Sequence, residues 1–281
     1  MTDFKLRTDP ATTLTRLRVH ADGSLTLAGE PLFWRSPAVL LERIRVMRKL
    51  AEPVLVVTPN VDQTIDLDRD PKFRGAYRDA ALRLIDGAPL TMLARLLGAT
   101  GVHRHTGADL LPFLVSESER EGWTVAIAGG GAGVSGLAVA RLQEAHPGAK
   151  VVNVPFPYLS VVDDPRSKEV VDALCSISPD IVFLCLGAPK QEMWFTHWRS
   201  MLPPGVYIGA GAAVDFAAGT ARRAPSVLRR LGAEWLWRLA QEPKRLGTRY
   251  LVKGPAFLAV VCRSILMHER WSVRVAREDL P

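Results

Sequence analysis

Short apolar runs recur along the chain, and most of them end in a loop rich in glycine or polar residues. Apolar runs of four to eight residues, rich in β-branched side chains, are typical of strands buried on both faces of a parallel sheet. Helical periodicity follows several of them, as over residues 134–146. The pattern predicts an α/β fold, a Rossmann-like doubly wound and mostly parallel sheet. The strand candidates are residues 54–58, 84–85, 124–128, 150–154, 181–186 and 206–208.

The two ends of the chain have a different pattern. Residues 17–27 predict a hairpin that turns at Asp22-Gly23, and residues 36–50 predict a helix. Near the C-terminus, residues 231–239 and 255–267 predict helices that carry apolar and aromatic side chains. We therefore divide the chain into a leading segment (1–50), a Rossmann-like core (51–220) and a C-terminal helical appendage (221–281).

Charge is unevenly distributed along the chain. Between Thr220 and Pro281 there are thirteen Arg or Lys and five acidic residues, a net charge of +8 against +7 for the whole chain. A nearly neutral body with a cationic tail predicts an anionic partner, namely phosphate, nucleic acid or a membrane surface. No apolar stretch approaches the ~20 residues of a membrane span, and the N-terminus lacks the apolar segment of a signal peptide. Three cysteines without metal-ligand spacing suggest buried thiols in a reducing cytoplasm.

Polar side chains follow several of the expected strands. Lys190 and Gln191 come after one strand, and Asp215, Arg222 and Arg223 come after the next. Because ligands of open α/β sheets bind at the carboxyl ends of the strands, we expect these groups to gather at one site.

Three further motifs each have two interpretations. Asp66-Leu67-Asp68 could be a divalent-metal clamp, but the Asp70-Pro71 pair after it is a helix-start signal, which we favour. Asp86-Gly87 after a short apolar run suits a general base, yet it is also a common turn. His103 and His105 could bind a metal, although an anion contact by Arg104 between them fits better.

A glycine-rich loop gives a competing functional hypothesis. Residues Gly131–Gly136 match G-x-G-x-x-G between a strand and a helix, which suits a phosphate at a helix N-terminus. The next strand ends without the acidic residue that would hold a ribose, which argues against an NAD(P)-dependent oxidoreductase. A non-enzymatic basic binding module would explain the cationic tail but not the polar groups at the sheet edge.

Several of these segments together resemble one family, the WecG/TagA/CpsF bacterial glycosyltransferases, also called glycosyltransferase family 26. The resemblance covers roughly residues 50–250, in family order, and leaves out the first 35 residues. The matching segments are Thr58-Pro59-Asn60, Asp86-Gly87, Arg104 with Gly107-Ala108-Asp109-Leu110, Ala128-Gly129-Gly130, Gly187-Ala188-Pro189-Lys190-Gln191-Glu192, Gly209 to Asp215 with Gly219, Arg223-Ala224-Pro225, Glu234-Trp235-Leu236-Trp237-Arg238 and Glu242-Pro243-Lys244-Arg245.

The resemblance implies an inverting transfer of a hexose or N-acetylhexosamine from a UDP-sugar. The acceptor would be a sugar on a polyprenyl diphosphate, in the biosynthesis of a cell-surface polysaccharide such as an exopolysaccharide. The family uses no bound metal or cofactor for its chemistry, and nucleic acid is not a partner. The basic appendage would hold the protein peripherally on the cytoplasmic face of the cell membrane, and a homo-oligomer is left open.

The resemblance also implies roles for single residues. Asp86 would be the general base, Thr58 and Asn60 would lie beside a sugar, Gln191 would bond the donor, and Asp215 would lie near the uridine. Arg222, Arg223 and Arg238 would stabilise the leaving UDP. Pro155-Phe156-Pro157-Tyr158 departs from the family pattern, as do His103 and His105. The remaining substrate-binding positions are Arg104, Gly129, Gly130, Gly187, Pro189, Lys190, Gly209 and Gly211.

Overall fold

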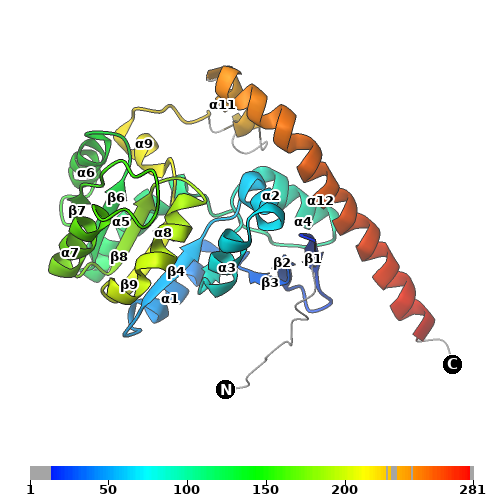
Figure 1. Ribbon diagram of the computed structural model, residues 1–281. Helices are drawn as coiled ribbons and strands as arrows, with labels where there is room; N and C mark the ends of the chain where they lie inside the picture. Colours follow the sequence, from blue (N-terminus) through cyan, green and yellow to red (C-terminus); the bar gives the residue numbers. More distant parts are fainter. Residues whose placement is uncertain (1–13, 226, 229–232, 242, 279–281) are drawn as a thin grey trace.

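The core is a six-stranded parallel sheet in the order β5-β4-β9-β8-β6-β7 (Figure 1). The computed structural model describes residues 14–225, 227–228, 233–241 and 243–278. Strands β4, β8 and β9 are buried along their whole length, as their apolar sequences require. The doubly wound parallel sheet expected from the sequence is confirmed. The strands are β4 (Pro53–Val57), β5 (Leu82–Arg83), β6 (Thr124–Gly129), β7 (Lys150–Val154), β8 (Ile181–Cys185) and β9 (Gly205–Gly209).

Helices cover both faces of this sheet. Successive strand residues point to opposite faces, so that Leu55 and Val57 join one apolar cluster while Val54 and Val56 join the other. The first cluster includes side chains of α2 (Val61–Arg69), α3 (Pro71–Asp79), α7 (Ser167–Ile177) and α8 (Lys190–Trp198). The second includes side chains of α1 (Pro37–Arg48), α5 (Gly107–Glu121), α6 (Val134–Ala145) and α9 (Ala213–Ala218).

Asp70 begins a helix, as its position before Pro71 predicted. Its side chain accepts hydrogen bonds from the backbone N–H groups of Lys72 and Phe73, and Pro71 occupies the first helical position.

The predicted N-terminal hairpin is confirmed and has a third strand that the sequence analysis did not foresee. Strands β1 (Leu17–Val19), β2 (Leu25–Leu27) and β3 (Glu30–Leu32) form a small antiparallel sheet beside α4 (Ala88–Leu96). An isolated parallel β-bridge between Phe33 and Leu84 places this small sheet beside the β5 edge of the main sheet.

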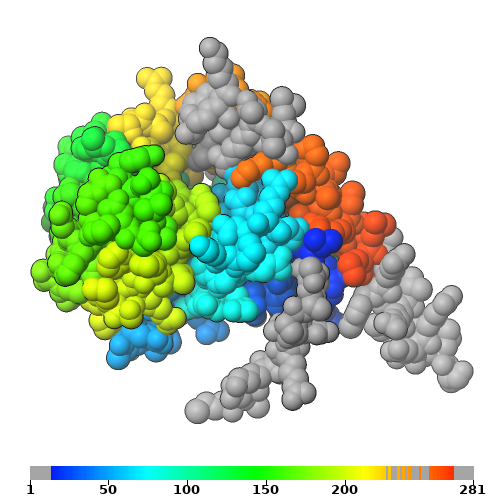
Figure 2. Space-filling model, viewed as in Figure 1, coloured from blue at the N-terminus to red at the C-terminus, as the bar shows by residue number. Residues whose placement is uncertain are grey.

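The appendage contains α11 (Glu234–Gln241) and α12 (Pro243–Glu278), which confirms helix in the described parts of both predicted segments. Helix α12 has 36 residues, runs through Pro255 and lies along one side of the molecule, past α2 and β1 (Figure 1). The α2–α3 segment lies between α12 on one side and α8 on the other (Figure 2). None of the described helices is both long and apolar enough to cross a membrane.

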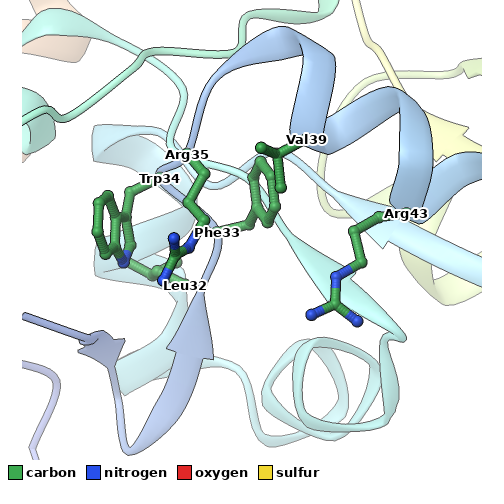
Figure 3. A pocket seen from close by; sticks show the side chains of 6 residues that line it. All are labelled: Leu32, Phe33, Trp34, Arg35, Val39 and Arg43. Atoms are coloured by element: carbon green, nitrogen blue, oxygen red, sulfur yellow. The ribbon is translucent and has the colours of Figure 1, made fainter. Parts of the chain in front are cut away.

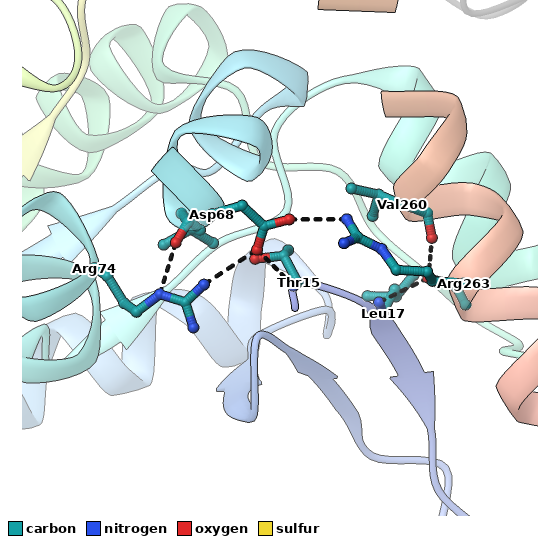
Figure 4. Close-up of polar contacts among 8 residues, drawn as sticks. Thr15, Leu17, Asp68, Arg74, Val260 and Arg263 are labelled. Carbon is teal, nitrogen blue, oxygen red and sulfur yellow. Dashed lines mark hydrogen bonds and ion pairs between the residues drawn. The ribbon is translucent and has the colours of Figure 1, made fainter. Parts of the chain in front are cut away.

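Asp68 joins three segments that are far apart in the sequence (Figure 4). Its carboxylate accepts from the Thr15 backbone N–H at 2.7 Å, from Arg74 Nη2 at 3.1 Å and from Arg263 Nη2 at 2.8 Å. Ser264 Oγ, one residue further along α12, accepts the Leu17 N–H at 3.0 Å. The start of β1 and the middle of α12 are thus held together on α2.

Candidate active site

The loops at the carboxyl edge of the sheet meet around residues 209–211. Thr58 Oγ1 donates to the Gly209 carbonyl at 2.9 Å, and Gln191 Oε1 accepts the Gly211 N–H at 3.0 Å. Gly107, at the start of α5, lies so close that an added Cβ would be 2.8 Å from the Ala210 oxygen. The end of β4, the first turn of α8, the end of β9 and the start of α5 are therefore in direct contact.

A cavity of about 520 Å³ opens beside this junction. It lies at the carboxyl ends of β6, β7, β8 and β9, where sheets of this kind bind their ligands. Lys190 and Asp215 both line it, as expected from the sequence. The other lining residues are Gly130, Gly131, Ala132, Phe156, Pro157, Tyr158, Leu159, Cys185, Leu186, Gly187, Gly211 and Ala212.

Lys190 fixes one wall of this cavity. Its Nζ donates to the Leu159 carbonyl at 2.7 Å and lies 5.2 Å from the centre of the Tyr158 ring. Phe156 packs edge-on against the buried Trp194, with ring centroids 5.1 Å apart. The segment that departs from the family pattern is thus a wall of the cavity, held from α8. Pro189, which precedes Lys190, is the N-cap residue of α8 and follows a cis peptide bond.

The glycine-rich loop after β6 serves close packing. Gly129 has φ +109°, and an added Cβ would lie 2.7 Å from the Cys185 carbonyl oxygen. Gly130 has φ +91° and donates its N–H to that same oxygen at 2.9 Å. Glycine is required here because the ends of β6 and β8 approach so closely.

Thr58, Asn60 and Asp86 follow β4 and β5 on the other side of the junction. Thr58 is buried, and Asn60 caps α2 by accepting from the N–H groups of Asp62 and Gln63. The Asp86 backbone N–H donates to the Pro59 carbonyl at 3.1 Å, which joins the two loops. Asp86 itself is half-buried.

Arg223 meets α5 at this edge. Its Nη1 donates to Asp109 Oδ1 at 2.6 Å, whereas its buried Nε and Nη2 have no hydrogen-bond partner among the described residues. Burial opposes the charged form of Arg223, but the charges of Asp109, Glu234 and Asp86 outweigh this and raise its pKa. Arg223 is therefore firmly charged and lies within electrostatic reach of Asp86, but it does not line the 520 Å³ cavity.

Two of the other predicted arginines lie near Arg223. Arg104 is half-buried, and its positive charge helps to lower the pKa of Asp109. Arg222 is exposed, and its carbonyl accepts from Trp237 Nε1 of α11 at 3.3 Å. Arg238 belongs to α11, but its side chain lies outside the described residues.

Gln191 is not open to solvent, and its neighbour Glu192 is a polar residue that the sequence analysis missed. Gln191 is 2% exposed, and its Nε2 donates to Glu192 Oε1 at 2.9 Å. The same Glu192 oxygen accepts from Gln63 Nε2 at 2.9 Å, and Glu192 has no exposed surface. The signal available in the sequence was an acid directly after Gln191 in the first turn of a helix.

A second, open hollow of about 310 Å³ lies at the start of α1 (Figure 3). Leu32, Phe33, Trp34, Arg35, Val39 and Arg43 line it, and the Arg35 guanidinium lies 5.0 Å from the Trp34 ring centre. It lies at the outer end of the sheet beyond β5, separate from the 520 Å³ cavity.

The histidine and aspartate motifs have structural partners. His105 is buried, bonds the Arg35 carbonyl through Nε2 at 2.7 Å, and has a lowered pKa because of burial. Asp66 pairs with Lys253 at 3.5 Å, and Asp68 is held as described above. Among the residues that the structure describes, no group of three or more His, Cys, Asp or Glu could hold a metal ion.

The family model described as "Glycosyl transferase WecG/TagA/CpsF family" matches residues 27–271. The chain belongs to this family. The match confirms the resemblance and corrects its limits, because it begins within the first 35 residues and includes most of α12. The family match favours the glycosyltransferase hypothesis over the dinucleotide hypothesis built on Gly131–Gly136.

One relative is similar to this chain over most of its length. It is the N-acetylglucosaminyldiphosphoundecaprenol N-acetyl-beta-D-mannosaminyltransferase of Bacillus spizizenii (strain ATCC 23059 / NRRL B-14472 / W23). The two proteins are 29% identical over 219 residues, which is 78% of this chain and 81% of the relative.

Proposed function

We propose that this glycosyltransferase moves a hexose or N-acetylhexosamine from a UDP-sugar to a sugar carried on a polyprenyl diphosphate, with inversion and without a catalytic metal. One observation carries the proposal. Family segments from five separate loops meet at a single sheet edge, beside a cavity of about 520 Å³ and the Asp86 loop. The name of the Bacillus relative supports the class of acceptor.

The 520 Å³ cavity is the proposed donor site. Its volume lies within the range of small-molecule sites, and its walls combine backbone from glycine loops with Asp215 and Lys190. Glycines at positions 130, 187 and 211 allow a ligand to approach the backbone closely. Asp215 would face the uridine, while Thr58 and Gln191 would act by holding the loops that shape the site.

The proposed reaction is a single displacement. An acceptor hydroxyl oxygen attacks the anomeric carbon, the bond between that carbon and the UDP oxygen breaks, and the configuration inverts. Asp86 takes the proton of the attacking hydroxyl as general base. UDP leaves with its negative charge, and the unpartnered Nε and Nη2 of Arg223 are suitable donors for its phosphate oxygens. Arg222 and Arg238 are proposed as further cations at this step, and Arg104 as an anion contact.

The appendage has one face suited to a membrane surface. Leu258, Cys262 and Leu266 are exposed at helical spacing on α12, whereas Val260 and Ser264 face the protein. The expectation of buried thiols is thus wrong for Cys262, and also for Cys175, and holds for Cys185. An exposed apolar stripe on a basic helix is typical of interfacial binding, and anionic lipid adds about 1 kcal/mol per nearby Lys or Arg. We propose that residues 221–281 both complete the site and hold the enzyme peripherally on the cytoplasmic membrane face, where the lipid-linked acceptor lies.

The test is UDP release over a panel of UDP-sugars, with and without a short-chain polyprenyl-diphosphate-linked sugar and with EDTA present. Acceptor-dependent release that resists EDTA is expected, and the donor that supports it names the sugar. A second arm measures binding to vesicles with and without anionic lipid. Release that requires a divalent metal would overturn metal independence. No release with any donor, together with thermal stabilisation by NAD, would restore the dinucleotide hypothesis.

A further inference from the structure

Glu192 is a buried carboxyl group at the first turn of α8, and the reaction proposed above does not use it. Its Oε1 accepts hydrogen bonds from two side-chain amides, Gln63 Nε2 on α2 and Gln191 Nε2 on α8, both at 2.9 Å. Glu192 does not line the 520 Å³ cavity and is fully buried. Its hydrogen bonds reach the site through these two neighbours.

The bond to Gln63 leads to the loop that precedes α2. Gln63 Oε1 accepts the Asn60 N–H at 3.1 Å, and Asn60 Oδ1 accepts the Gln63 N–H at 3.2 Å. This reciprocal pair fixes residues 58–60, and the Pro59 carbonyl in turn holds the Asp86 N–H at 3.1 Å. The position of the proposed general base thus depends on the Gln63 side chain.

The bond to Gln191 leads to the opposite side of the site. Gln191 Oε1 accepts the Gly211 N–H at 3.0 Å, and Gly211 lines the cavity together with Asp215. Both glutamine oxygens are therefore committed to backbone N–H groups. Both amide nitrogens must then point at residue 192, which has to offer an acceptor.

We propose that Glu192 is a positioning residue that couples the two sides of the site, the 58–60 loop through Gln63 and the 209–211 loop through Gln191. The inference rests on the proposed function, in which the first loop serves the acceptor and the second serves the donor.

The coupling requires an acceptor oxygen rather than a charge. The pKa of Glu192 is raised to about 7, chiefly because burial opposes the charged form; hydrogen bonds from Gln191 and Gln63 lower it, and the charge of Asp66 on α2 contributes to the rise. Oε2 has no hydrogen-bond partner among the described residues, so a proton there would disturb neither amide. A glutamine at position 192 offers the same accepting oxygen, whereas a leucine of similar size leaves two buried amides unsatisfied.

Two variants separate the roles of the oxygen and the charge. Glu192→Gln and Glu192→Leu are compared with the wild type, and Glu169→Leu serves as the matched control because Glu169 is an exposed acid in the first turn of α7. The first readout is hydrogen–deuterium exchange, which requires no activity. Glu192→Leu should speed exchange at both residues 58–63 and 209–213, while Glu192→Gln and Glu169→Leu should leave both segments as in the wild type. Faster exchange in only one segment would overturn the coupling.

The second readout is steady-state kinetics, normalised to the folded fraction. Glu192→Leu should lower kcat about 100-fold and raise KM for both donor and acceptor, while Glu192→Gln should stay within about threefold of wild type. Unchanged kcat in folded Glu192→Leu would overturn the proposal. A Glu192→Gln variant as impaired as Glu192→Leu would do so too, because the charge or proton would then be needed. Absence of transfer by the wild-type enzyme would instead contradict the proposed function and leave the exchange result to stand alone.

Discussion

Gln191 occupies the space that a side chain on residue 209 would need. A Cβ built on Gly209 would lie 2.6 Å from Gln191 Nε2 and 3.0 Å from Glu192 Oε1. On the other side, the Gly209 carbonyl accepts the Thr58 hydroxyl. Gly209, the last residue of β9, is thus enclosed by Thr58, which follows β4, and by side chains of α8. The site therefore requires a residue without a Cβ at this position.

Gly209→Ala should therefore damage activity more than folding. The new methyl group must displace the Gln191 amide, and overpacking of this kind costs about 1–3 kcal/mol. We expect kcat/KM to fall at least tenfold in protein that still unfolds cooperatively in urea. Gly75→Ala is the control, since no atom lies within 4 Å of its new Cβ and alanine is favoured in a helix such as α3. Wild-type kinetics in Gly209→Ala would show that the Gln191 position is unimportant.

Asp86→Asn tests the general base. The amide preserves shape but cannot take the hydroxyl proton, so kcat should fall by about 10²–10⁴ with an unchanged Tm and unchanged UDP affinity. Asp79→Asn, at an exposed acid at the end of α3, should have no effect. If Asp86→Asn turns over at near the wild-type rate, the base assignment is wrong.

The sequence was sufficient to predict the strands and helices that show a clear periodicity of apolar residues or a helix-start signal. The runs at 150–154 and 181–186 became β7 and β8, and Asp70-Pro71 began α3. Lys190 and Asp215 do line one cavity, because the ends of parallel strands meet at one edge. The predictions that rested on strand periodicity and helix-start signals were confirmed.

Side-chain pairing could not be predicted in this way. Asp68 could be interpreted as a metal clamp because its partners, Thr15 and Arg263, are 53 and 195 residues away. Gln191 was expected to bond substrate, but whether its amide is committed to Glu192 and Gly211 depends on the three-dimensional approach of α8 to β9. Local pattern carries no information about such contacts.

Asp68→Ala should loosen the start of β1 and the middle of α12. Although burial raises its pKa, bonds from Thr15 and Arg263 lower it overall, so the carboxylate is charged in the folded protein. Its loss leaves Arg263 without this partner and should reduce the free energy of unfolding by about 1–3 kcal/mol. Exchange should accelerate at residues 15–19 and 257–265 together. Asp79→Ala is the control. Faster exchange at only one of the two segments would show that Asp68 does not join them.

Arg223→Lys separates charge from hydrogen bonding at the proposed UDP site. Lysine keeps the positive charge near Asp109 but cannot reproduce the two buried donors, Nε and Nη2, that have no described partner. If those donors bind the leaving UDP, Arg223→Lys should lose kcat almost as severely as Arg223→Ala, on the order of 10–100-fold. Arg120→Lys, on the exposed face of α5, is the control. A fully active Arg223→Lys variant would mean that charge alone is used.

Glu192 should make stability depend on pH in a defined window. Because its folded pKa is about 7 and its unfolded pKa is about 4.3, the folded protein binds one more proton than the unfolded protein between these values. Stability from this group is therefore present at low pH and falls as pH rises, by about 1.4 kcal/mol per unit, levelling off above pH 7. The lowered pKa of His105 acts in the opposite direction below pH 6.5 but is common to wild type and Glu192→Gln.

Urea unfolding at pH 5, 6, 7 and 8 should thus show the stability of the wild type, relative to Glu192→Gln, decreasing steadily up to pH 7. A difference that does not vary with pH would place the pKa of Glu192 outside this window, and a difference that increases with pH would mean that the folded protein prefers the ionised carboxylate.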